Sequence, residues 1–431
     1  MRRCAIVGFG CAGYHAAEEL RRRDPQAEIS VFSDHSLAPY NPMLTTYYAA
    51  GRIPFDAAFP FGGLPEIGTR LRLDLRPNCR VARVDGKNRR LLLEGGESET
   101  FDSILLSTGA KAFAPPIEGL PKDRTFLMRT MDDAQALRAR LSQGDLKRVL
   151  VVGASMVGIK VVEMFHRMGC GVVLADLAPY IFPLAASPKC AAAIERRLTN
   201  QGVELLMGAG LERIEARENG IAAYFTGREA PVEAEYLAMC IGVRSNMSFV
   251  DRTELQVDRG VLVSETMQTN IPYIYAAGDV AQGRNLATGQ NQIIGLLANA
   301  RMQGRTAGRH MCGLPSGYEG NLLHNITHFM GMDFVGLGEV RSYDRVEERF
   351  TEDCLEQFFY TADRLTGYNS LDLYGDCGVL KNTMLKQYIQ GEKSAGPGPA
   401  DGLTALLAQL EVLEKVEERK SWYDTTTAAQ G

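Results

Sequence analysis

Two glycine-rich loops hold the residues of this chain whose types and spacing could do chemistry. The first follows the pattern GxGxxG, with its glycines at Gly8, Gly10 and Gly13. In such a loop one glycine makes a tight turn, the next lets the backbone approach a pyrophosphate, and the third permits a helix to pack closely on a strand. Free N–H groups at the helix N-terminus then bind the phosphates, which the helix dipole favours. These three glycines are predicted to bind a dinucleotide.

The second loop reads Gly-Ala-Ser-Met-Val-Gly, from Gly153 through Ser155 to Gly158, with serine at the middle glycine position. Serine is small enough for close backbone approach, so we expect this loop to bind a dinucleotide with less room. Each loop is followed, at the end of the next strand, by an acid that can accept hydrogen bonds from ribose hydroxyls, Asp34 or Asp176. A carboxylate at Asp176 repels a 2′-phosphate, and no arginine lies just after it, which favours NADH over NADPH.

These loops need a strand before them and a helix after them, and the flanking sequence predicts both. Strand, helix and strand are expected at residues 4–9, 10–23 and 28–33, and again at residues 148–152, 153–168 and 171–175. Two such units, each opened by glycines, imply two dinucleotide-binding folds within one chain. A length of 431 residues agrees with about two to three domains.

Composition excludes several classes of function. A net charge of −5 gives no basic footprint for nucleic acid, and no apolar run approaches the ~20 residues that a membrane span needs. The nine cysteines are scattered without a CxxC pair, so we expect reduced, mostly buried thiols and neither an iron–sulfur site nor a local redox dithiol. No metal site is expected. Because the first residues run straight into the first glycine loop, a cleaved signal peptide would remove chemistry, and a cytoplasmic protein is expected.

Two further segments identify a family. Residues 107–110 (Ser-Thr-Gly-Ala) close an apolar strand, and residues 269–280 (Thr-Asn-Ile-Pro-Tyr-Ile-Tyr-Ala-Ala-Gly-Asp-Val) lie far downstream. Together with both loops, these segments resemble the two-dinucleotide-domain flavoprotein family of pyridine-nucleotide oxidoreductases over about residues 1–390. Four motifs in the right order make the resemblance specific.

The resemblance implies FAD on the first loop and a nicotinamide dinucleotide on the second, where Asp176 favours NADH over NADPH. It carries FAD-binding roles to Thr108, Gly109, Gly278 and Asp279, with Asp279 on the ribityl chain. A helix that begins near residues 289–292 would point its N-terminus at the flavin, where the helix dipole would stabilise the anion of the reduced ring.

The fold that the resemblance implies is α/β, with two Rossmann-like dinucleotide-binding domains, the FAD domain being discontinuous, plus an α+β C-terminal interface domain. The predicted boundaries are residues 1–112 and 245–315 for the FAD-binding domain, 113–244 for the NAD-binding domain, 316–391 for the C-terminal interface domain, and 392–431 for a linker and terminal helix. Residues 241–246 match the strand that returns from the NAD domain to the FAD domain.

The segment at residues 38–45 bears on the subfamily. It looks like the corresponding segment of rubredoxin reductases, putidaredoxin reductases and nitrite reductase flavin domains, but it lacks their arginine after Tyr-Asn. It can also be set against NADH oxidases and coenzyme A disulfide reductases, in which a single redox cysteine would fall at or near Met43. Methionine forms no thiolate or mixed disulfide, so disulfide reductase and cysteine-based peroxidase chemistry are disfavoured.

A lysine stands where the family often has a glutamate near the nicotinamide. After the second loop this chain reads Gly158-Ile-Lys160, and the family lysine that pairs with that glutamate is matched by Thr46. Lys160 is therefore a candidate catalytic residue that would stabilise anionic flavin or bind an acidic substrate, and the alternative is a solvated helix lysine. His324 and His328 are interpreted as structural histidines on a strand, with a substrate contact as the alternative.

These features predict an FAD-dependent NADH:acceptor oxidoreductase, in which hydride passes from NADH to flavin N5 and electrons then leave for a carrier protein or a partner subunit. One alternative is direct reduction of oxygen or of a small organic substrate. Another, from a different class, is a structural or signalling flavoprotein whose assembly responds to NADH. After a Gly-Pro-rich break at residues 394–402, leucines recur at helical spacing, so the C-terminal domain and helix are candidate contacts for a homodimer or hetero-oligomer.

Overall fold

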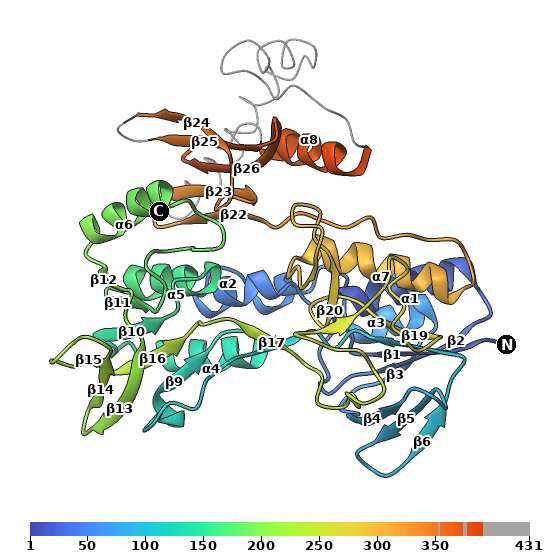
Figure 1. Ribbon diagram of the computed structural model, residues 1–431. Helices are drawn as coiled ribbons and strands as arrows, with labels where there is room; N and C mark the ends of the chain where they lie inside the picture. The colour runs from blue at the N-terminus through green and yellow to red at the C-terminus, as the bar shows by residue number, and fades with distance from the viewer. Residues whose placement is uncertain (352–353, 374–376, 391–431) are drawn as a thin grey trace.

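The computed structural model describes residues 1–351, 354–373 and 377–390, which form three units (Figure 1). The linker and terminal helix predicted at residues 392–431 lie outside the described residues. Within the described ranges, no helix combines the length and the apolar character that crossing a membrane requires.

The first unit is built on a five-stranded parallel sheet in the order β19-β7-β1-β2-β3. Its central strands are nearly continuous runs of buried apolar residues, as parallel strands covered on both faces require. The chain enters this unit twice, because β19 and α7 come from far downstream of the other elements. The main elements are β1 (Arg3–Val7), α1 (Cys11–Arg23), β2 (Glu28–Phe32), α3 (Leu64–Leu71), β3 (Asp74–Arg76), β7 (Ser103–Leu106), β19 (Ile274–Ala276) and α7 (Leu297–Met311), with an antiparallel sheet of β4 (Val81–Asp85), β5 (Arg90–Leu93) and β6 (Ser98–Thr100).

The second unit repeats the same plan with a parallel sheet in the order β12-β11-β10-β16-β9. A three-stranded antiparallel sheet, β13-β14-β15, shares a hydrophobic cluster with one face of it. The elements are β9 (Thr125–Leu127), α4 (Met131–Leu141), β10 (Arg148–Val152), α5 (Met156–Arg167), β11 (Gly171–Asp176), α6 (Pro188–Asn200), β12 (Glu204–Met207), β13 (Leu211–Arg217), β14 (Gly220–Phe225), β15 (Val232–Ala234) and β16 (Tyr236–Met239). The two strand–helix–strand units expected around the glycine loops are thus confirmed as β1-α1-β2 and β10-α5-β11.

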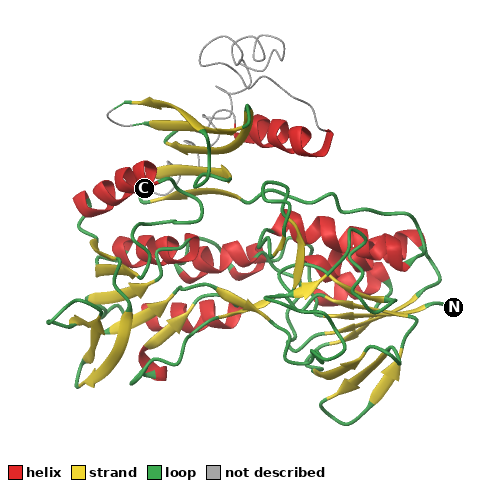
Figure 2. Cartoon of the chain, viewed as in Figure 1, coloured by secondary structure: helices red, strands yellow, loops and turns green. Residues whose placement is uncertain are grey.

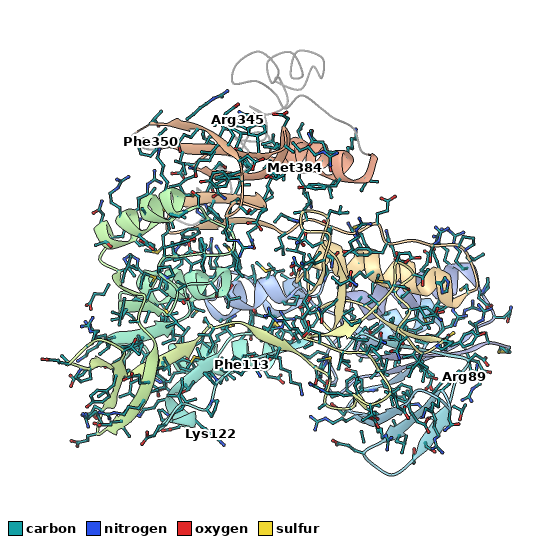
Figure 3. All side chains as sticks on the ribbon, in the orientation of Figure 1. Arg89, Phe113, Lys122, Arg345, Phe350 and Met384 are labelled. Atoms are coloured by element: carbon teal, nitrogen blue, oxygen red, sulfur yellow. The ribbon has the colours of Figure 1, made fainter. Side chains whose placement is uncertain are left out.

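A two-stranded antiparallel ribbon connects the two units. Strand β8 (Ala110–Ala112) leaves the first unit and pairs with β17 (Val243–Ser245), which returns to it. Phe113, labelled in Figure 3, lies where the two units meet, and the guanidinium carbon of Arg244 stands 3.7 Å from the centroid of its ring. The short helices η1 (Pro42–Leu44) and α2 (Thr45–Ala49) also reach across, because α2 packs on α4 and α5.

The third unit is a five-stranded antiparallel sheet, β22-β23-β26-β25-β24, with one helix, α8, beside it (Figure 2). Its elements are β22 (His324–Phe329), β23 (Met332–Gly338), β24 (Arg345–Phe350), β25 (Leu355–Thr361), β26 (Arg364–Leu371) and α8 (Cys377–Gln390). The sheet lies against α5 and α6 of the second unit (Figure 1). Two parallel sheets with helices and one antiparallel sheet with a helix confirm the predicted α/β class with its α+β C-terminal part.

The helix expected to begin near residues 289–292 starts later, and that part of the prediction is wrong. Residues 291–292 instead form β21 (Asn291–Gln292), which pairs antiparallel with β20 (Ala281–Arg284), and α7 begins only at Leu297. The physical reason is that β20 forms hydrogen bonds with the backbone groups of β21, so these groups are not available for a helix.

A buried amide group ties the third unit to the second. Asn369 on β26 is fully buried, its Nδ2 donates to the carbonyl oxygen of Ala185 at 2.7 Å, and its Oδ1 accepts from the amide of Ser187 at 2.7 Å. Ser187 is also the N-cap of α6, because its Oγ accepts from the amide of Cys190. The start of α6 and the third unit are therefore positioned by one polar contact.

We expect Asn369→Ala to destabilise the protein by about 1–3 kcal/mol, because the amide of Ser187 and the carbonyl of Ala185 lose their partner in a buried place. Calorimetric unfolding of the purified protein would measure this as a lower Tm. The control is Asn88→Ala, since Asn88 is exposed in a turn and a surface change costs within about 0.5 kcal/mol. Equal Tm values for the two variants would contradict the role assigned to Asn369.

Candidate functional site

The first glycine loop forms an open backbone cradle between β1 and α1. Gly8 has a φ of +93°, in the region that favours glycine, and a Cβ at Gly13 would meet the carbonyl of Gly8 and the Oγ of Ser107. Gly10 differs, because no atom lies within 4 Å of the place of its Cβ, and as N-cap of α1 it makes no side-chain hydrogen bond. The first N–H groups of α1 thus have no side-chain cap, and the open space at Gly10 lets a phosphate group approach them.

Two sets of residues line the approach to this cradle. Asp34 is exposed two residues beyond the end of β2, where its carboxylate is free to meet a ribose. At the end of β7, the hydroxyl of Thr108 donates to the carbonyl of Asn246 at 2.8 Å, and the carbonyl of Gly109 accepts from the amide of Asn246 at 2.9 Å. Gly109 has a φ of +65° and open space at its Cβ position. The structure therefore places Thr108 and Gly109 at the start of the ribbon between the units.

Asp279 is held by an arginine that the sequence motifs did not reveal. The Nη2 of Arg129 lies 2.6 Å from Oδ2 of Asp279, and its Nε donates to the carbonyl of Ala110 at 3.2 Å. Arg129 stands between β9 and α4, so this ion pair joins the second unit to the first. The signal that could have found it is local: Arg129 directly precedes a capping box of Thr130 and Asp133, which predicts a loop at the carboxyl end of a parallel strand.

The N-terminus of α7 closes the far side of this site. Its N-cap makes no side-chain hydrogen bond, so its first N–H groups and its positive dipole end face the site uncapped. Gly278 has a φ of +81°, and its amide donates to Oε1 of the fully buried Gln303 on α7 at 2.8 Å. The thiol of Cys11 donates to the carbonyl of Leu297 at 3.5 Å, which brings the start of α1 against the start of α7.

The cysteines next to these loops are poor nucleophiles. Burial raises the pKa of Cys11 to about 11, although the positive charge of Arg301 works in the opposite direction. Burial also raises the pKa of Cys240, which lies behind the second loop, to about 12. A thiol with such a pKa stays protonated near neutral pH and is not a thiolate nucleophile. At the position of the family's redox cysteine, Met43 is 54% exposed.

The second loop has the same glycine sterics but a filled middle position. Gly153 has a φ of +113°, and a Cβ at Gly158 would collide with the carbonyl of Gly153. Ser155 is the N-cap of α5, since its Oγ accepts from the amide of Gly158 at 3.1 Å and donates to the carbonyl of Cys240 at 2.9 Å. The loop thus leaves fewer free donors than the first.

Asp176 stands at the end of β11 with its carboxylate fixed in place. Its Oδ2 accepts from the amide of Ala154 at 2.6 Å, and its Oδ1 accepts from the amide of Ala178 at 2.8 Å. The two backbone contacts fix the orientation of the carboxylate next to the loop. A fixed negative charge here accepts hydrogen bonds from a 2′-hydroxyl and repels a 2′-phosphate.

Lys160 lies one turn into α5, only 6% exposed, so the alternative of a solvated lysine is wrong. Its Nζ donates to the carbonyl of His328 and lies 3.2 Å from Oε2 of Glu163 and 5.1 Å from the ring centroid of Tyr47. Thr46, the match for the family lysine, is buried on α2 beside Tyr47. The structure thus brings Lys160 to the meeting point of all three units.

The two histidines lie on β22 in different surroundings. Lys381 on α8 donates to Nε2 of His324 at 3.0 Å, and burial, helped by the charge of Lys381, lowers the pKa of His324. His328 is largely exposed, with its Nδ1 2.6 Å from Oδ1 of Asp333. Within the part of the chain that the structure describes, no group of three or more His, Cys, Asp or Glu side chains could hold a metal ion.

Comparison with known proteins agrees with this geometry. A model of the family described as pyridine nucleotide-disulphide oxidoreductase matches residues 2–304. The NADH oxidase of Methanocaldococcus jannaschii is 29% identical over 343 residues, 78% of this chain and 76% of that protein. The NADH-dependent phenylglyoxylate dehydrogenase subunit epsilon of Aromatoleum evansii is 27% identical over 389 residues, 89% of this chain and 91% of that subunit. Putidaredoxin reductase, in its covalent complex with putidaredoxin, has the same fold, with a TM-score of 0.81 at 21% identity over 91% of this chain and 99% of that one.

We expect Gly10→Ala to leave the fold intact and to weaken FAD retention by ~10-fold or more, which is about 1.4 kcal/mol of binding free energy. The methyl group has open space in the protein, but it occupies the surface that the pyrophosphate approaches. Fluorescence release of FAD on dilution would measure the affinity, and circular dichroism the fold. Gly13→Ala is the contrasting variant, because its Cβ meets the backbone and should unfold the loop itself. A Gly10→Ala protein that keeps FAD as tightly as the parent would refute the cradle.

Proposed function

We propose that this chain, which belongs to the pyridine nucleotide-disulphide oxidoreductase family, delivers electrons from NADH through FAD to a carrier protein or a partner subunit. It is a flavin-dependent NAD(P)H oxidoreductase, with FAD and NADH as its cofactors. The observation that carries the proposal is the pair of glycine loops, each with its own acid, on two units that a ribbon and an ion pair connect. A cytoplasmic location is part of the proposal.

We assign the cofactors to the two units by the character of their loops. FAD is assigned to the first unit, on Gly8, Gly10, Gly13, Asp34, Thr108, Gly109, Gly278 and Asp279. NADH is assigned to the second unit, on Gly153, Ser155, Gly158 and Asp176. The open, uncapped first loop suits a cofactor that stays bound, and the serine-capped second loop suits one that must leave after each turnover.

The side chains around the junction hold and orient rather than transfer protons. When bound, FAD supplies the ring that accepts hydride from NADH and passes electrons on. Arg129 fixes the carboxylate of Asp279 for the ribityl chain, and the uncapped N-terminus of α7 offers donors to negative charge beside it. Lys160 is the proposed catalytic side chain, because its buried ammonium places a positive charge where the units meet. Orientation of the two rings supplies most of the rate enhancement.

The electron acceptor is inferred from the cysteine thiols near the loops, from the relatives and from the third unit. The thiols beside the loops have raised pKa values, so electrons leave without a cysteine relay. One relative is named as a subunit of an NADH-dependent dehydrogenase, which supports a partner subunit, and the third unit is the proposed contact for a partner or a second copy. The second candidate function is direct reduction of oxygen or of a small organic substrate, which the NADH oxidase relative favours. The remaining alternative is a structural or signalling flavoprotein whose assembly responds to NADH. In that case the oxidation of NADH would be incidental to its role.

Anaerobic stopped-flow reduction of the purified protein tests the proposal directly. Fast bleaching of the flavin absorbance by NADH and slow bleaching by NADPH are expected, followed by reoxidation with oxygen or with candidate carrier proteins. A turnover of ~1–10³ per second with the right acceptor would exclude a purely structural role. If neither nucleotide bleaches the flavin, the reductase proposal fails.

We expect Asp176→Ala to weaken NADH binding about 10- to 100-fold and to narrow the preference over NADPH. The reason is the loss of charged hydrogen bonds to the ribose, worth about 1.5–3 kcal/mol, together with the loss of repulsion toward a 2′-phosphate. The dependence of the bleaching rate on each nucleotide would measure both effects. Asp34→Ala, the equivalent change at the other loop, should weaken FAD retention and leave the NADH-to-NADPH ratio unchanged. A ratio that shifts equally in both variants would overturn the assignment of the loops.

A further inference from the structure

A buried carboxylate, Glu163, lies at the centre of the junction that holds Lys160. Its side chain is 4% exposed, on the face of α5 that points toward the third unit. Its oxygens lie 3.2 Å from Nζ of Lys160, 3.0 Å from Nη2 of Arg167 and 4.0 Å from Nη1 of Arg52, and Oε1 accepts from the amide of Met330 at 3.3 Å. One carboxylate therefore faces three cations and a backbone amide.

These partners come from all three units of the chain. Lys160 and Arg167 lie on α5 of the second unit, Arg52 follows α2 of the first unit, and Met330 belongs to the turn between β22 and β23 of the third unit. Arg52 and Arg167 are 39% and 51% exposed, so water also solvates them. The Lys160 ammonium is buried, so it depends most on the carboxylate.

Three side chains of the second unit bind backbone groups of the β22–β23 turn, two of them on α5 and the third being Gln201, whose Nε2 donates to the carbonyl of Met330 at 3.0 Å. Met330 and Gly331 have φ values of +50° and +74°, which is the geometry of a tight two-residue hairpin turn. Glu163 takes the amide of Met330, and Lys160, one helical turn earlier, donates to the carbonyl of His328. An acceptor and a donor on the same face of α5 thus hold a donor and an acceptor of the same hairpin. These hydrogen bonds use the backbone of the hairpin and none of its side chains. They therefore depend on where the hairpin lies and not on which side chains it carries.

We propose that Glu163 is a positioning residue that locks the β22–β23 hairpin and the Lys160 ammonium onto α5, the helix whose N-terminus receives NADH. The third unit is then held on the second through this hairpin, and Arg52 of the first unit lies 4.0 Å from the same carboxylate. Tyr47 on α2 touches the same lock, because Lys160 and Arg52 lie 5.1 and 4.9 Å from its ring centroid. The expected effect on hydride transfer rests on the proposed function. The attachment of the β22–β23 hairpin to α5 through Glu163 and Lys160, called the lock below, does not depend on that function.

Glu19 provides a matched control. It is also a glutamate with a 4% exposed side chain among three arginines, at 2.6 Å from Arg22, 3.0 Å from Arg23 and 4.0 Å from Arg309. All of these residues lie on α1 and α7 of the first unit, so its network joins no two units. Neutralising Glu19 therefore removes a buried carboxylate of the same kind without touching the junction.

The test compares Glu163→Gln with Glu19→Gln in the FAD-loaded protein. For Glu163→Gln we expect hydrogen exchange of peptides covering residues 326–334 to speed up ~10-fold or more. The neutral side-chain amide is a weaker acceptor for the Met330 amide than the carboxylate, and it leaves the buried Lys160 without its counter-charge. Stopped-flow reduction at saturating NADH should slow about 10-fold, because the two rings are less well oriented, while the Kd for NADH changes less than about twofold. Glu19→Gln should lower the Tm and leave both the exchange at 326–334 and the saturating rate as in the parent.

Two further variants keep the outcome decisive. If Glu163 acts through Lys160, Glu163→Gln should add little to the slowing already caused by Lys160→Met. Should Glu163→Gln not fold, the Lys160→Met, Glu163→Gln double variant removes both charges, and it should show the faster exchange on its own. Unchanged exchange at 326–334, or an equal slowing in Glu19→Gln, would overturn the lock. Failure of NADH to bleach the unmodified protein would instead sink the proposed function, and the exchange result would still decide the lock.

Discussion

The close contact of backbone on backbone at the two glycine loops is the constraint on which the rest of this structure depends. At Gly13 and Gly158, the place of a Cβ is taken by the carbonyl of the glycine that opens the loop. Only a glycine at these positions, with hydrogen in place of a side chain, lets α1 follow β1 and α5 follow β10 so closely. The first N–H groups of each helix then point toward its own loop. Every other feature of the site is placed relative to these two helix starts.

The two loops solve the same steric problem with different outcomes at the middle position. Gly10 leaves open space and an uncapped helix, whereas Ser155 caps its helix and engages the carbonyl of Cys240. A hydroxyl that already satisfies an amide leaves one donor fewer for a phosphate. The two loops therefore differ by a single side chain in the number of amide donors left free at the helix start.

Charge at the junctions then decides how the units are held together. Arg129 pairs with Asp279 across the second and first units. Glu163 and Lys160 pair with each other on α5 and join the second unit to the third through the amide of Met330 and the carbonyl of His328. Both pairs are largely withdrawn from water, where removing one partner leaves a charge without compensation. A buried ion pair adds little net stability over apolar packing, whereas the loss of one partner is strongly destabilising.

The sequence by itself determined the parts of this protein that depend on short-range rules. Both loops were predicted from the glycine spacing and from the acids at Asp34 and Asp176. The strand and helix periods predicted the two strand–helix–strand units around the loops and the α/β class. Only the tertiary structure decided the partners of Asp279 and Lys160, because Arg129 is 150 residues from the first and His328 is 168 from the second. It also decided that α7 begins at Leu297, since β21 pairs with β20 instead of extending the helix. Local patterns encode local geometry, but which charges meet across a junction depends on how separately folded units dock, and no spacing along the chain carries that information.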